Sequence, residues 1–500
     1  MRSIASLSSC LLLTASALAG GLQEEIKGLV QSVGPRKGTV AISVRDDGGN
    51  EVVNIKGGVP VMPASNQKLL TTGAALRVLG ADFAFQTKLL RSGDRLTVLG
   101  DGDPAFGDPD LLKQMTYTAA DGAVQRGMTV DGLLALWTGA AKAAGITQVK
   151  ELVVDDRVFD RSTCHADWPV DQLHEAYCAE VSGLNFHLNR LDFWAVPSPR
   201  GAEITRTEPS CAFVGIRNAT TPGKTKDDAI WIQREIDSNN FTIRGFLRKP
   251  LVSPVGVTVD SPSMFFGNLL AERLRAAGVQ VGVVRLAEAG EPAASGEVVG
   301  AVFRTPIRTA ITQCNVESQN LYAESLLKRL GHAATGQPGS WNNGTEAMER
   351  LVSARVGGAA GLDAADGSGL SRENRVTASI LTAWVGDLQR DPALGELFLK
   401  SLAVGGKSGT VHKRFRDIDP EVATIRCKTG YIDGVCSLSG VVDCANGECP
   451  TFSVICNGFE ADGVGRAKQL QEAVVKAVLR AYVRQPARPT PGDRPALGGG

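Results

Sequence analysis

Residues 63–76 place a lysine where a buried helix begins, and this stretch constrains the fold more than any other. Pro63 and Ser65 stand at its entrance, where a helix leaves backbone N–H groups unpaired. The residues that follow are mostly apolar, which predicts a helix in the core and not on the surface. Because positions i and i+3 share one face of a helix, the Ser65 hydroxyl and the Lys68 amine should point the same way.

This pair has a chemistry of its own. Burial disfavours the ammonium form, so the pKa of Lys68 should fall, and the neutral amine can take a proton from the Ser65 hydroxyl. The helix N-terminus favours negative charge on the serine oxygen. A Ser-x-x-Lys pattern also arises by chance on solvated helix turns, so this interpretation requires partners elsewhere in the chain.

A second serine and an amide come much later. Ser318, Gln319 and Asn320 precede an apolar helix expected over residues 321–330. Ser318 can relay a proton to a departing amine, and Asn320 can hold a substrate amide or Lys68.

The second lysine lies in the segment Lys428-Thr429-Gly430, which follows the strand-like residues 422–427. Lys428 should lower the pKa of Lys68 by like-charge repulsion and attract a substrate carboxylate. Gly430 would let a ligand backbone lie close along the strand.

Composition and charge describe an ordinary globular protein without a nucleic-acid partner. The 500 residues are enough for two or more domains, with 43% hydrophobic and 21% charged residues. Lys+Arg and Asp+Glu both number 53, so the formal net charge is zero. The chain has no dense basic run for binding phosphates.

Residues 1–19 resemble an export signal, with one arginine, a short apolar stretch and a cleavage motif at Ala17-Leu18-Ala19. The apolar run is too short to span a bilayer, and no later stretch is long and apolar enough. We therefore expect a periplasmic or otherwise exported protein that is soluble after cleavage, with peripheral membrane association left open. Residues 486–500 are rich in Pro, Gly and Arg and should be disordered.

Strand and helix patterns divide the remaining chain into three blocks. Residues 38–60 alternate like a hairpin, and a helix is expected over residues 263–277. We expect residues 20–83 and 297–485 to form one catalytic domain. Residues 84–296, with short strand-like runs and many turns, should form one or two inserted, mostly β domains.

Nine of the ten cysteines follow the export signal, and in an oxidising compartment some should pair. Cys444 and Cys449 flank an Asn-Gly turn, and the expected hairpin places them opposite each other, which predicts a disulfide. The same register puts Cys436 and Cys456 on opposite faces of the sheet, so they should not pair unless a bulge intervenes. An odd number leaves at least one thiol free or paired between chains.

Three other patterns resemble functional motifs but do not need a function to explain them. Cys164, His165, His174 and Cys178 have zinc-ligand chemistry, although a Cys164–Cys178 disulfide, or no bond, suits an exported protein better. The segment 406–408 resembles the end of a phosphate loop but lacks the required glycine five residues earlier. Residues 180–185 resemble the deacylating glutamate motif of class A β-lactamases with one residue too many, and we attribute this to chance.

Ser-x-x-Lys, Ser-x-Asn and Lys-Thr-Gly, in this order, resemble the motifs of the penicillin-binding protein and serine β-lactamase superfamily. About 250 positions separate Lys68 from Ser318. An insertion of this size resembles the DacB type, the class C low-molecular-mass penicillin-binding proteins. Further stretches agree with that group: Gly102-Asp103-Pro104, residues 153–156, Phe159-Asp160, residues 366–372 with Asn374, Gly409-Thr410 and Arg414-Phe415.

The resemblance implies a fold and an activity. The fold would be an α/β serine transpeptidase/β-lactamase-like domain, with an antiparallel sheet flanked by helices and a large β-rich insertion. The activity would be serine-type D-alanyl-D-alanine carboxypeptidase and endopeptidase action on peptidoglycan stem peptides and cross-links. It would need no metal or cofactor, and β-lactams would be covalent inhibitors.

The resemblance also implies roles for single residues. Ser65 would attack the substrate with Lys68 as base, and the backbone N–H groups of Ser65 and Tyr431 would hold the oxyanion. Lys428 and Thr429 would hold the terminal carboxylate. Tyr431 stands where the family commonly has a small hydroxyl residue, which bears on substrate preference.

The family keeps an acidic residue in its insertion that binds the amino-bearing side chain of the stem peptide. Residues 168–171 with Tyr177 resemble that region, and we assign this role to Asp171; the alternative is a solvated loop aspartate.

Two other functions remain open at this point. One is a β-lactamase or esterase on the same scaffold, which requires fast deacylation, and the chain offers no good deacylating glutamate. The other is a catalytically silent peptidoglycan-binding protein, which would have no need of a serine paired with a buried lysine.

Overall fold

The computed structural model describes residues 4–118, 124–223, 228–358 and 360–484. The chain forms two compact units. Unit 1 holds Met1–Arg77, Ile311–Ser318 and Thr345–Gly500, and unit 2 holds Val78–Ala310 and Gln319–Gly344. The motif Ser318-Gln319-Asn320 therefore crosses from one unit to the other.

Unit 1 is built on a six-stranded sheet with the order β17-β18-β19-β20-β1-β2, and every neighbouring pair is antiparallel. Its strands are β1 (Thr39–Arg45), β2 (Glu51–Ile55), β17 (Ala403–Val404), β18 (Ala423–Ile432), β19 (Val435–Cys444) and β20 (Thr451–Asn457). Its helices are α1 (Ile4–Val33), α9 (Ala378–Gln389), α10 (Gly395–Lys400) and α11 (Gly463–Val483), with short 3-10 helices η1 (Ala64–Asn66) and η5 (Gly409–Val411). It also holds most of α2 (Gln67–Leu79), α6 (Ile307–Val316) and α8 (Trp341–Val356), whose residues 78–79, 307–310 and 341–344 belong to unit 2.

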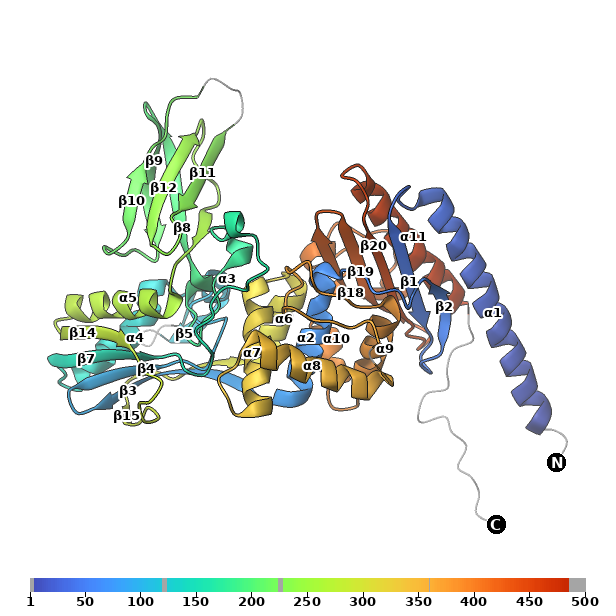
Figure 1. Ribbon diagram of the computed structural model, residues 1–500, viewed down its shortest axis with the longest axis horizontal. Coiled ribbons are helices and arrows are strands. Elements are labelled where there is room, and N and C mark those ends of the chain that lie inside the picture. The colour runs from blue at the N-terminus through green and yellow to red at the C-terminus, as the bar shows by residue number, and fades with distance from the viewer. Residues whose placement is uncertain (1–3, 119–123, 224–227, 359, 485–500) are drawn as a thin grey trace, which may run out of the picture. The chain divides into compact units, whose positions relative to one another are not determined.

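Helices cover both faces of this sheet. Helices α1 and α11 lie side by side against one face (Figure 1), where Leu22 and Leu470 join strand residues such as Ile42 in one hydrophobic core. Helix α9 packs on β1 and β20, and its Thr382 hydroxyl lies 2.7 Å from the hydroxyl of Ser43. Alternation along β1 thus sends apolar side chains to one layer and Ser43 to the other.

Unit 2 has a mixed sheet with the order β14-β7-β4-β3-β15, and β16 also pairs with β3. Its strands are β3 (Ala84–Ser92), β4 (Arg95–Leu99), β5 (Thr116–Thr118), β6 (Val124–Arg126), β7 (Gln148–Asp155), β8 (Arg190–Ser198), β9 (Gly201–Glu208), β10 (Gly215–Asn218), β11 (Ala229–Arg234), β12 (Asn240–Phe246), β13 (Val255–Thr258), β14 (Gln280–Leu286), β15 (Glu297–Val298) and β16 (Phe303–Pro306). Its helices are α3 (Pro109–Gln114), α4 (Val130–Ala143), α5 (Pro262–Ala276) and α7 (Asn320–Thr335), with 3-10 helices η2 (Val170–Gln172), η3 (Ala176–Cys178) and η4 (His187–Asn189).

The core of unit 2 joins this sheet to two helices. Trp137 of α4 and Phe266 of α5 are fully buried together with strand residues such as Leu152. The strands β8–β13 form two smaller three-stranded sheets with a second core. The expected fold class, an α/β protein with an antiparallel sheet flanked by helices, is confirmed, and the inserted block is richer in helix than expected.

Several expected elements are confirmed with small shifts of boundary. The hairpin within residues 38–60 is the antiparallel pair β1–β2, and the helix expected over residues 263–277 is α5. The strand expected to lead into the Lys-Thr-Gly motif is β18, which continues through the motif to Ile432.

The expected cysteine register is wrong by one residue. Cys444 donates its N–H to the carbonyl of Glu448 (2.9 Å), so Glu448 and not Cys449 stands opposite it. The loop has three residues, and Gly447 adopts φ +86°, as in hairpins that end with a left-handed glycine. All nine cysteines that follow residue 19 are free thiols in the structure.

The shifted register changes the second pair as well. Cys436 and Cys456 lie directly opposite each other on β19 and β20, with both side chains in the unit 1 core. The expectation that they point to opposite faces is therefore wrong, because a one-residue shift moves every side chain of a strand to the other face.

The ends of the chain bear on two further expectations. The side chains of residues 1–18, which hold most of the expected export signal, and the tail at residues 485–500 lie outside the described residues. Across the part of the chain that is described, we find no helix that combines the length and the apolar character needed to cross a bilayer.

Candidate active site

Ser65 sits on a tight turn that opens helix α2. The first turn is the 3-10 helix η1, and Ala64 adopts φ +47°, a left-handed conformation that an alanine rarely takes. Such strain persists only where the surrounding structure imposes it, and it is often found at functional sites. Lys68 follows one turn later and is fully buried, and its Nζ lies 2.9 Å from the Ser65 Oγ.

The second serine and the second lysine form a similar pair. Ser318 follows the end of α6 with φ +60°, and its Oγ accepts a hydrogen bond of 2.8 Å from the Nζ of Lys428. The Asn315 side chain fixes this end of α6, because its amide donates to the hydroxyls of Thr72 (3.2 Å) and Ser401 (3.0 Å). The Lys428 Nζ also donates to the Thr429 carbonyl (2.8 Å).

The alternation of β18 explains how its residues reach the site. Ile425 and Cys427 point into the unit 1 core, so Lys428 and Gly430, at the positions of opposite parity near the Ser65 turn, are directed away from it. A Cβ added to Gly430 would lie 2.8 Å from the Ser65 nitrogen and 2.9 Å from the Pro63 carbonyl oxygen. The close approach of the chain's own backbone therefore requires a glycine at position 430, and the expectation that a ligand backbone lies along the strand there stays a prediction.

The two lysines influence each other electrostatically. Lys428 is fully buried, and burial together with the positive charge of Lys68 lowers its pKa from an ordinary value of 10.5 to about 7. The expected like-charge repulsion thus acts on Lys428. An amine that titrates near neutral pH can exchange protons with neighbouring hydroxyl groups.

Sequence reasoning missed three polar residues that tie the Ser65 turn to the sheet. The Asn66 side chain, oriented to satisfy both sides, donates to the Lys428 carbonyl (2.9 Å) and accepts from Ser439 Oγ (2.6 Å). The Ser437 hydroxyl donates to the Pro63 carbonyl (2.6 Å). Ser437 and Ser439 are paired with Gly430 and Lys428 across β18–β19. Their spacing by two on a buried strand is the one signal in the sequence for this role.

The remaining expected residues of β18 lie at an open edge. The Thr429 hydroxyl donates to the Thr410 hydroxyl (2.7 Å), and the side chain of Tyr431 is 53% exposed. The Tyr431 hydroxyl lies 3.4 Å from a carboxylate oxygen of Asp433, and Arg372 donates to the Asp433 carbonyl (2.9 Å). The Tyr431 ring is thus largely exposed to solvent, and its effect on substrate preference stays a prediction.

Two expected site residues belong to unit 2. Asn320 begins helix α7, and its side-chain amide donates to the Tyr177 carbonyl (2.8 Å). Asp171 is exposed within η2, and the neighbouring Gln172 accepts a hydrogen bond from the Tyr177 hydroxyl (2.7 Å). The Ser-x-Asn motif therefore contacts the segment that carries Asp171. Their catalytic and binding roles stay predictions.

The structure accounts for two of the patterns that resemble functional motifs, the one at residues 180–185 and the possible zinc ligands. Glu180 accepts from Arg234 (3.4 Å) and from the Ser261 backbone (3.1 Å), which accounts for its burial. The residues proposed as an alternative zinc site do not form one: within the described ranges, no group of three or more His, Cys, Asp or Glu side chains could hold a metal ion.

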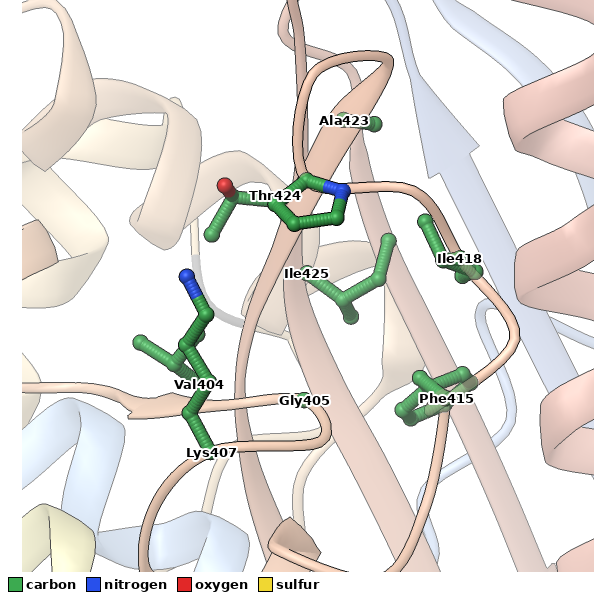
Figure 2. A pocket seen from close by; sticks show the side chains of 9 residues that line it. Val404, Gly405, Lys407, Phe415, Ile418, Ala423, Thr424 and Ile425 are labelled. Carbon is green, nitrogen blue, oxygen red and sulfur yellow. The ribbon is translucent and has the colours of Figure 1, made fainter.

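The segment 406–408 borders a small pocket and not a phosphate site. Figure 2 shows the Lys407 side chain beside mainly apolar neighbours at the start of β18. The cavity measures about 30 Å³, which leaves room for one or two water molecules. Its lining residues are Val404, Gly405, Lys407, Phe415, Ile418, Pro420, Ala423, Thr424 and Ile425.

Comparison with known proteins adds independent evidence. The chain is 30% identical over 462 residues to a D-alanyl-D-alanine carboxypeptidase of Actinomadura sp. (strain R39), an alignment that covers 87% of this chain and 81% of that protein. Its fold matches the crystal structure of penicillin binding protein 4 (dacB) from Haemophilus influenzae with a TM-score of 0.73 at 20% identity, covering 90% of this chain and 99% of that one. A second structure of that protein, complexed with a novel β-lactam, matches with a TM-score of 0.68 at 20% identity over 91% of this chain and 99% of that one.

A family model matches almost the whole chain. It is the model of the D-Ala-D-Ala carboxypeptidase 3 (S13) family, and the match runs over residues 22–479, including Ser65, Ser318 and Lys428. The Ser65–Lys68 and Ser318–Lys428 pairs thus lie in a chain that belongs to the D-Ala-D-Ala carboxypeptidase 3 (S13) family.

Proposed function

We propose that the protein cleaves the bond between two D-alanines of peptidoglycan stem peptides through an acyl-enzyme formed on Ser65. The observation that carries this proposal is the contact of Ser65 Oγ with the amine of a fully buried lysine, at 2.9 Å. Neither a binding protein nor a scaffold protein has a use for this pair. The family supports the same substrate.

The first step is the attack of Ser65. Lys68, as a neutral amine, takes the hydroxyl proton while Oγ bonds to the carbonyl carbon between the two D-alanines. The backbone N–H groups of Ser65 and Tyr431 hold the developing oxyanion, and each donor contributes about 3 kcal/mol in comparable sites. The nearness of Gly430 to the Ser65 nitrogen supports this pairing of donors.

The second step releases the terminal D-alanine. Ser318 gives its hydroxyl proton to the leaving amine and recovers one from Lys428, which is hydrogen-bonded to it at 2.8 Å. The proton that Lys68 took from Ser65 then replaces the one that Lys428 gave. Lys428 and Thr429 bind the carboxylate of the leaving residue. Lys68, neutral again, takes a proton from water as the water oxygen bonds to the acyl carbon, and returns it to the Ser65 oxygen as the ester bond breaks.

Two further residues recognise the stem peptide in this proposal. Asp171 binds the amino-bearing side chain, and Asn320 orients the peptide amide. The contact of Asn320 with the Tyr177 carbonyl supports a link between the two roles. The exposed Tyr431 ring adds an apolar contact to the peptide.

Substrate and export belong together. Peptidoglycan lies outside the cytoplasm, so the expected export signal at residues 1–19 would deliver the enzyme to the periplasm. Cross-links in peptidoglycan contain the same type of D-alanyl bond, and we include endopeptidase action in the proposal.

Labelling with penicillin tests the nucleophile. Incubation with a fluorescent penicillin, followed by intact-mass spectrometry, should add one penicilloyl group to the wild type and none to Ser65→Ala. The β-lactam complex of the Haemophilus influenzae relative supports the choice of probe. An unlabelled wild type would refute the proposal. Loss of the adduct within seconds would indicate a β-lactamase instead, and persistence for hours agrees with a peptidase.

The role of Asp171 needs a substrate comparison. Asp171→Asn should raise KM about tenfold for a stem-peptide analogue with a free side-chain amine and change little for its N-acetylated form, because only the amine is charged. The exposed Asp167, on the same segment, offers the control variant Asp167→Asn. Equal effects on both substrates would remove Asp171 from the binding site.

A further inference from the structure

A buried carboxylate organises the loop that faces helix α2. We call residues 366–374 the Asp366 loop. The Asp366 side chain is fully buried and accepts three hydrogen bonds, from the backbone N–H groups of Gly369 and Ser371 (both 2.7 Å) and from the side-chain amide of Asn374 (2.9 Å). Such bonds to an ionised acceptor are the strong ones, so the loop has one well-defined shape.

Asn374 closes the loop from its other end. Its side-chain oxygen accepts from the backbone N–H groups of Ala365 (2.9 Å) and Asp366 (3.2 Å), and its amide also donates to the Ser371 carbonyl (2.9 Å). Asp366 and Asn374 therefore hold each other and the intervening backbone.

The shape of this loop brings consecutive backbone groups against α2. The Gly367 carbonyl accepts from the Thr71 hydroxyl (2.7 Å), and the Ser368 carbonyl accepts from the Lys68 Nζ (2.8 Å). Gly369 has φ +82°, and a Cβ there would lie 1.9 Å from the carbonyl oxygen of Ala64, the residue before Ser65. The loop is thus moulded on the Ser65 turn.

The contact with Lys68 has a chemical consequence. A carbonyl oxygen only accepts, so Ser368 fixes one N–H of Lys68 whether the amine is neutral or charged. A neutral amine has one lone pair, and fixing an N–H limits its rotation and leaves the lone pair available to Ser65. When the proton arrives, the same bond becomes charge-assisted and strengthens. Lys428 on β18 is a second titratable amine close to this pair, since the charge of Lys68 contributes to the lowering of its pKa.

We propose that Asp366 is a positioning residue of the active site, which holds the Ser368 carbonyl against Lys68 and so orients the general base toward Ser65. Asp366 touches no reacting atom and acts through the loop backbone. The inference rests on the proposed function, in which Lys68 takes the Ser65 proton.

The test separates acylation from binding. Asp366→Asn keeps the volume but puts an amide donor against a backbone donor. The concentration dependence of penicillin labelling yields the dissociation constant of the non-covalent complex and the acylation rate constant. We expect that rate constant to fall about ten- to a hundredfold with an unchanged dissociation constant, because a displaced base costs rate and not affinity.

The pH profile provides a readout that a merely structural role would not move. The acylation rate rises with pH as Lys68 loses its proton. Without the Ser368 acceptor the ammonium form is less stable, so this rise should move to lower pH in Asp366→Asn. Asp363→Asn is the matched control, since Asp363 is exposed just before the loop, and it should behave as the wild type.

A second pair of variants covers the case in which Asp366→Asn does not fold. Thr71→Val removes the bond to the Gly367 carbonyl and should lower the acylation rate constant severalfold, and Thr71→Ser, which keeps a hydroxyl, should restore it. A folded Asp366→Asn protein, or Thr71→Val if the former does not fold, with wild-type acylation rate and pH profile would overturn the inference and leave the proposed function intact. A wild type that is not acylated on Ser65 would overturn both.

Discussion

Lys428 in unit 1 and Lys328 in unit 2 are both fully buried, yet the groups around their amines carry opposite charges. Lys328 has a carboxylate partner, Asp160, at 2.7 Å, donates to the Ser162 carbonyl (2.6 Å), and lies 3.8 Å from the centre of the Trp341 ring. The partners of Lys428 are the oxygens of Ser318 and Thr429, and among the described residues no carboxylate forms an ion pair with it.

This difference in neighbouring charge distinguishes a lysine that forms an ion pair from one that can exchange protons. Burial lowers the pKa of both amines, but the charge of Asp160 counteracts this effect at Lys328, whereas the charge of Lys68 reinforces it at Lys428. A carboxylate partner favours the charged form of a buried amine, so it opposes the effect of burial on the pKa of Lys328. A buried amine beside another amine gains and loses its proton near neutral pH.

The largest expected effect comes from removing the base. Lys68→Met should lower the rate of acylation by penicillin on the order of a hundredfold or more, because Ser65 then lacks its proton acceptor. The free energy of unfolding should change much less than the activation free energy of acylation, since a buried amine is replaced by an apolar chain of similar size. Stopped-flow labelling and urea denaturation measure the two quantities. Acylation at the wild-type rate would show that Lys68 is not the base for Ser65.

The next effect concerns stability and pH. The folded protein holds Lys428 with a pKa of about 7, below its ordinary value of 10.5. Between these values the unfolded chain binds a proton that the folded protein lacks, so the free energy of unfolding rises with pH in this window. Below pH 7 both states hold the proton, and the Lys428 contribution stays at its lowest level.

Lys428→Met should remove this slope. Urea denaturation at several values of pH from 7.5 to 9.5 should show a steeper rise for the wild type than for the variant, with a total difference on the order of a few kcal/mol. Parallel curves for the two proteins would mean that Lys428 keeps its proton throughout.

The smallest expected effect on acylation comes from replacing Lys328, the buried lysine of unit 2 that has a carboxylate partner. Lys328→Met leaves the carboxylate of Asp160 without its partner and should destabilise the protein by about 1–3 kcal/mol, at the low end of values for buried pairs because Asp160 is 34% exposed. Acylation by penicillin should change less than twofold. A loss of acylation as large as that of Lys68→Met would contradict the assignment of a purely structural role.

The parts of the site that were predictable are local in the chain. Ser65 and Lys68 are three residues apart on a helix, so their contact follows from helix geometry alone. The alternation of β18 predicted a strand before Lys428, and the family motifs pointed to Ser318 as a partner. Their 2.8 Å contact joins residues 110 positions apart, which no local pattern specifies.

Other features depended on details of packing. The hairpin register failed by one residue because a three-residue loop with a left-handed glycine replaced the expected one, and this moved Cys456 to the face of Cys436. Nothing in the sequence indicated that the Ser65 turn packs so closely on Gly430 that a side chain there would not fit. The Ser368 carbonyl escaped prediction because a backbone oxygen leaves no signature in the sequence.

The sequence by itself determined which chemical groups are present and which elements carry them, because helix and strand periodicities act over a few residues. Only the tertiary structure decided which buried lysine lies beside a carboxylate and which lies near another lysine. Proton affinity inside a protein depends on burial and on charges a few ångströms away, and those neighbours come from distant parts of the chain.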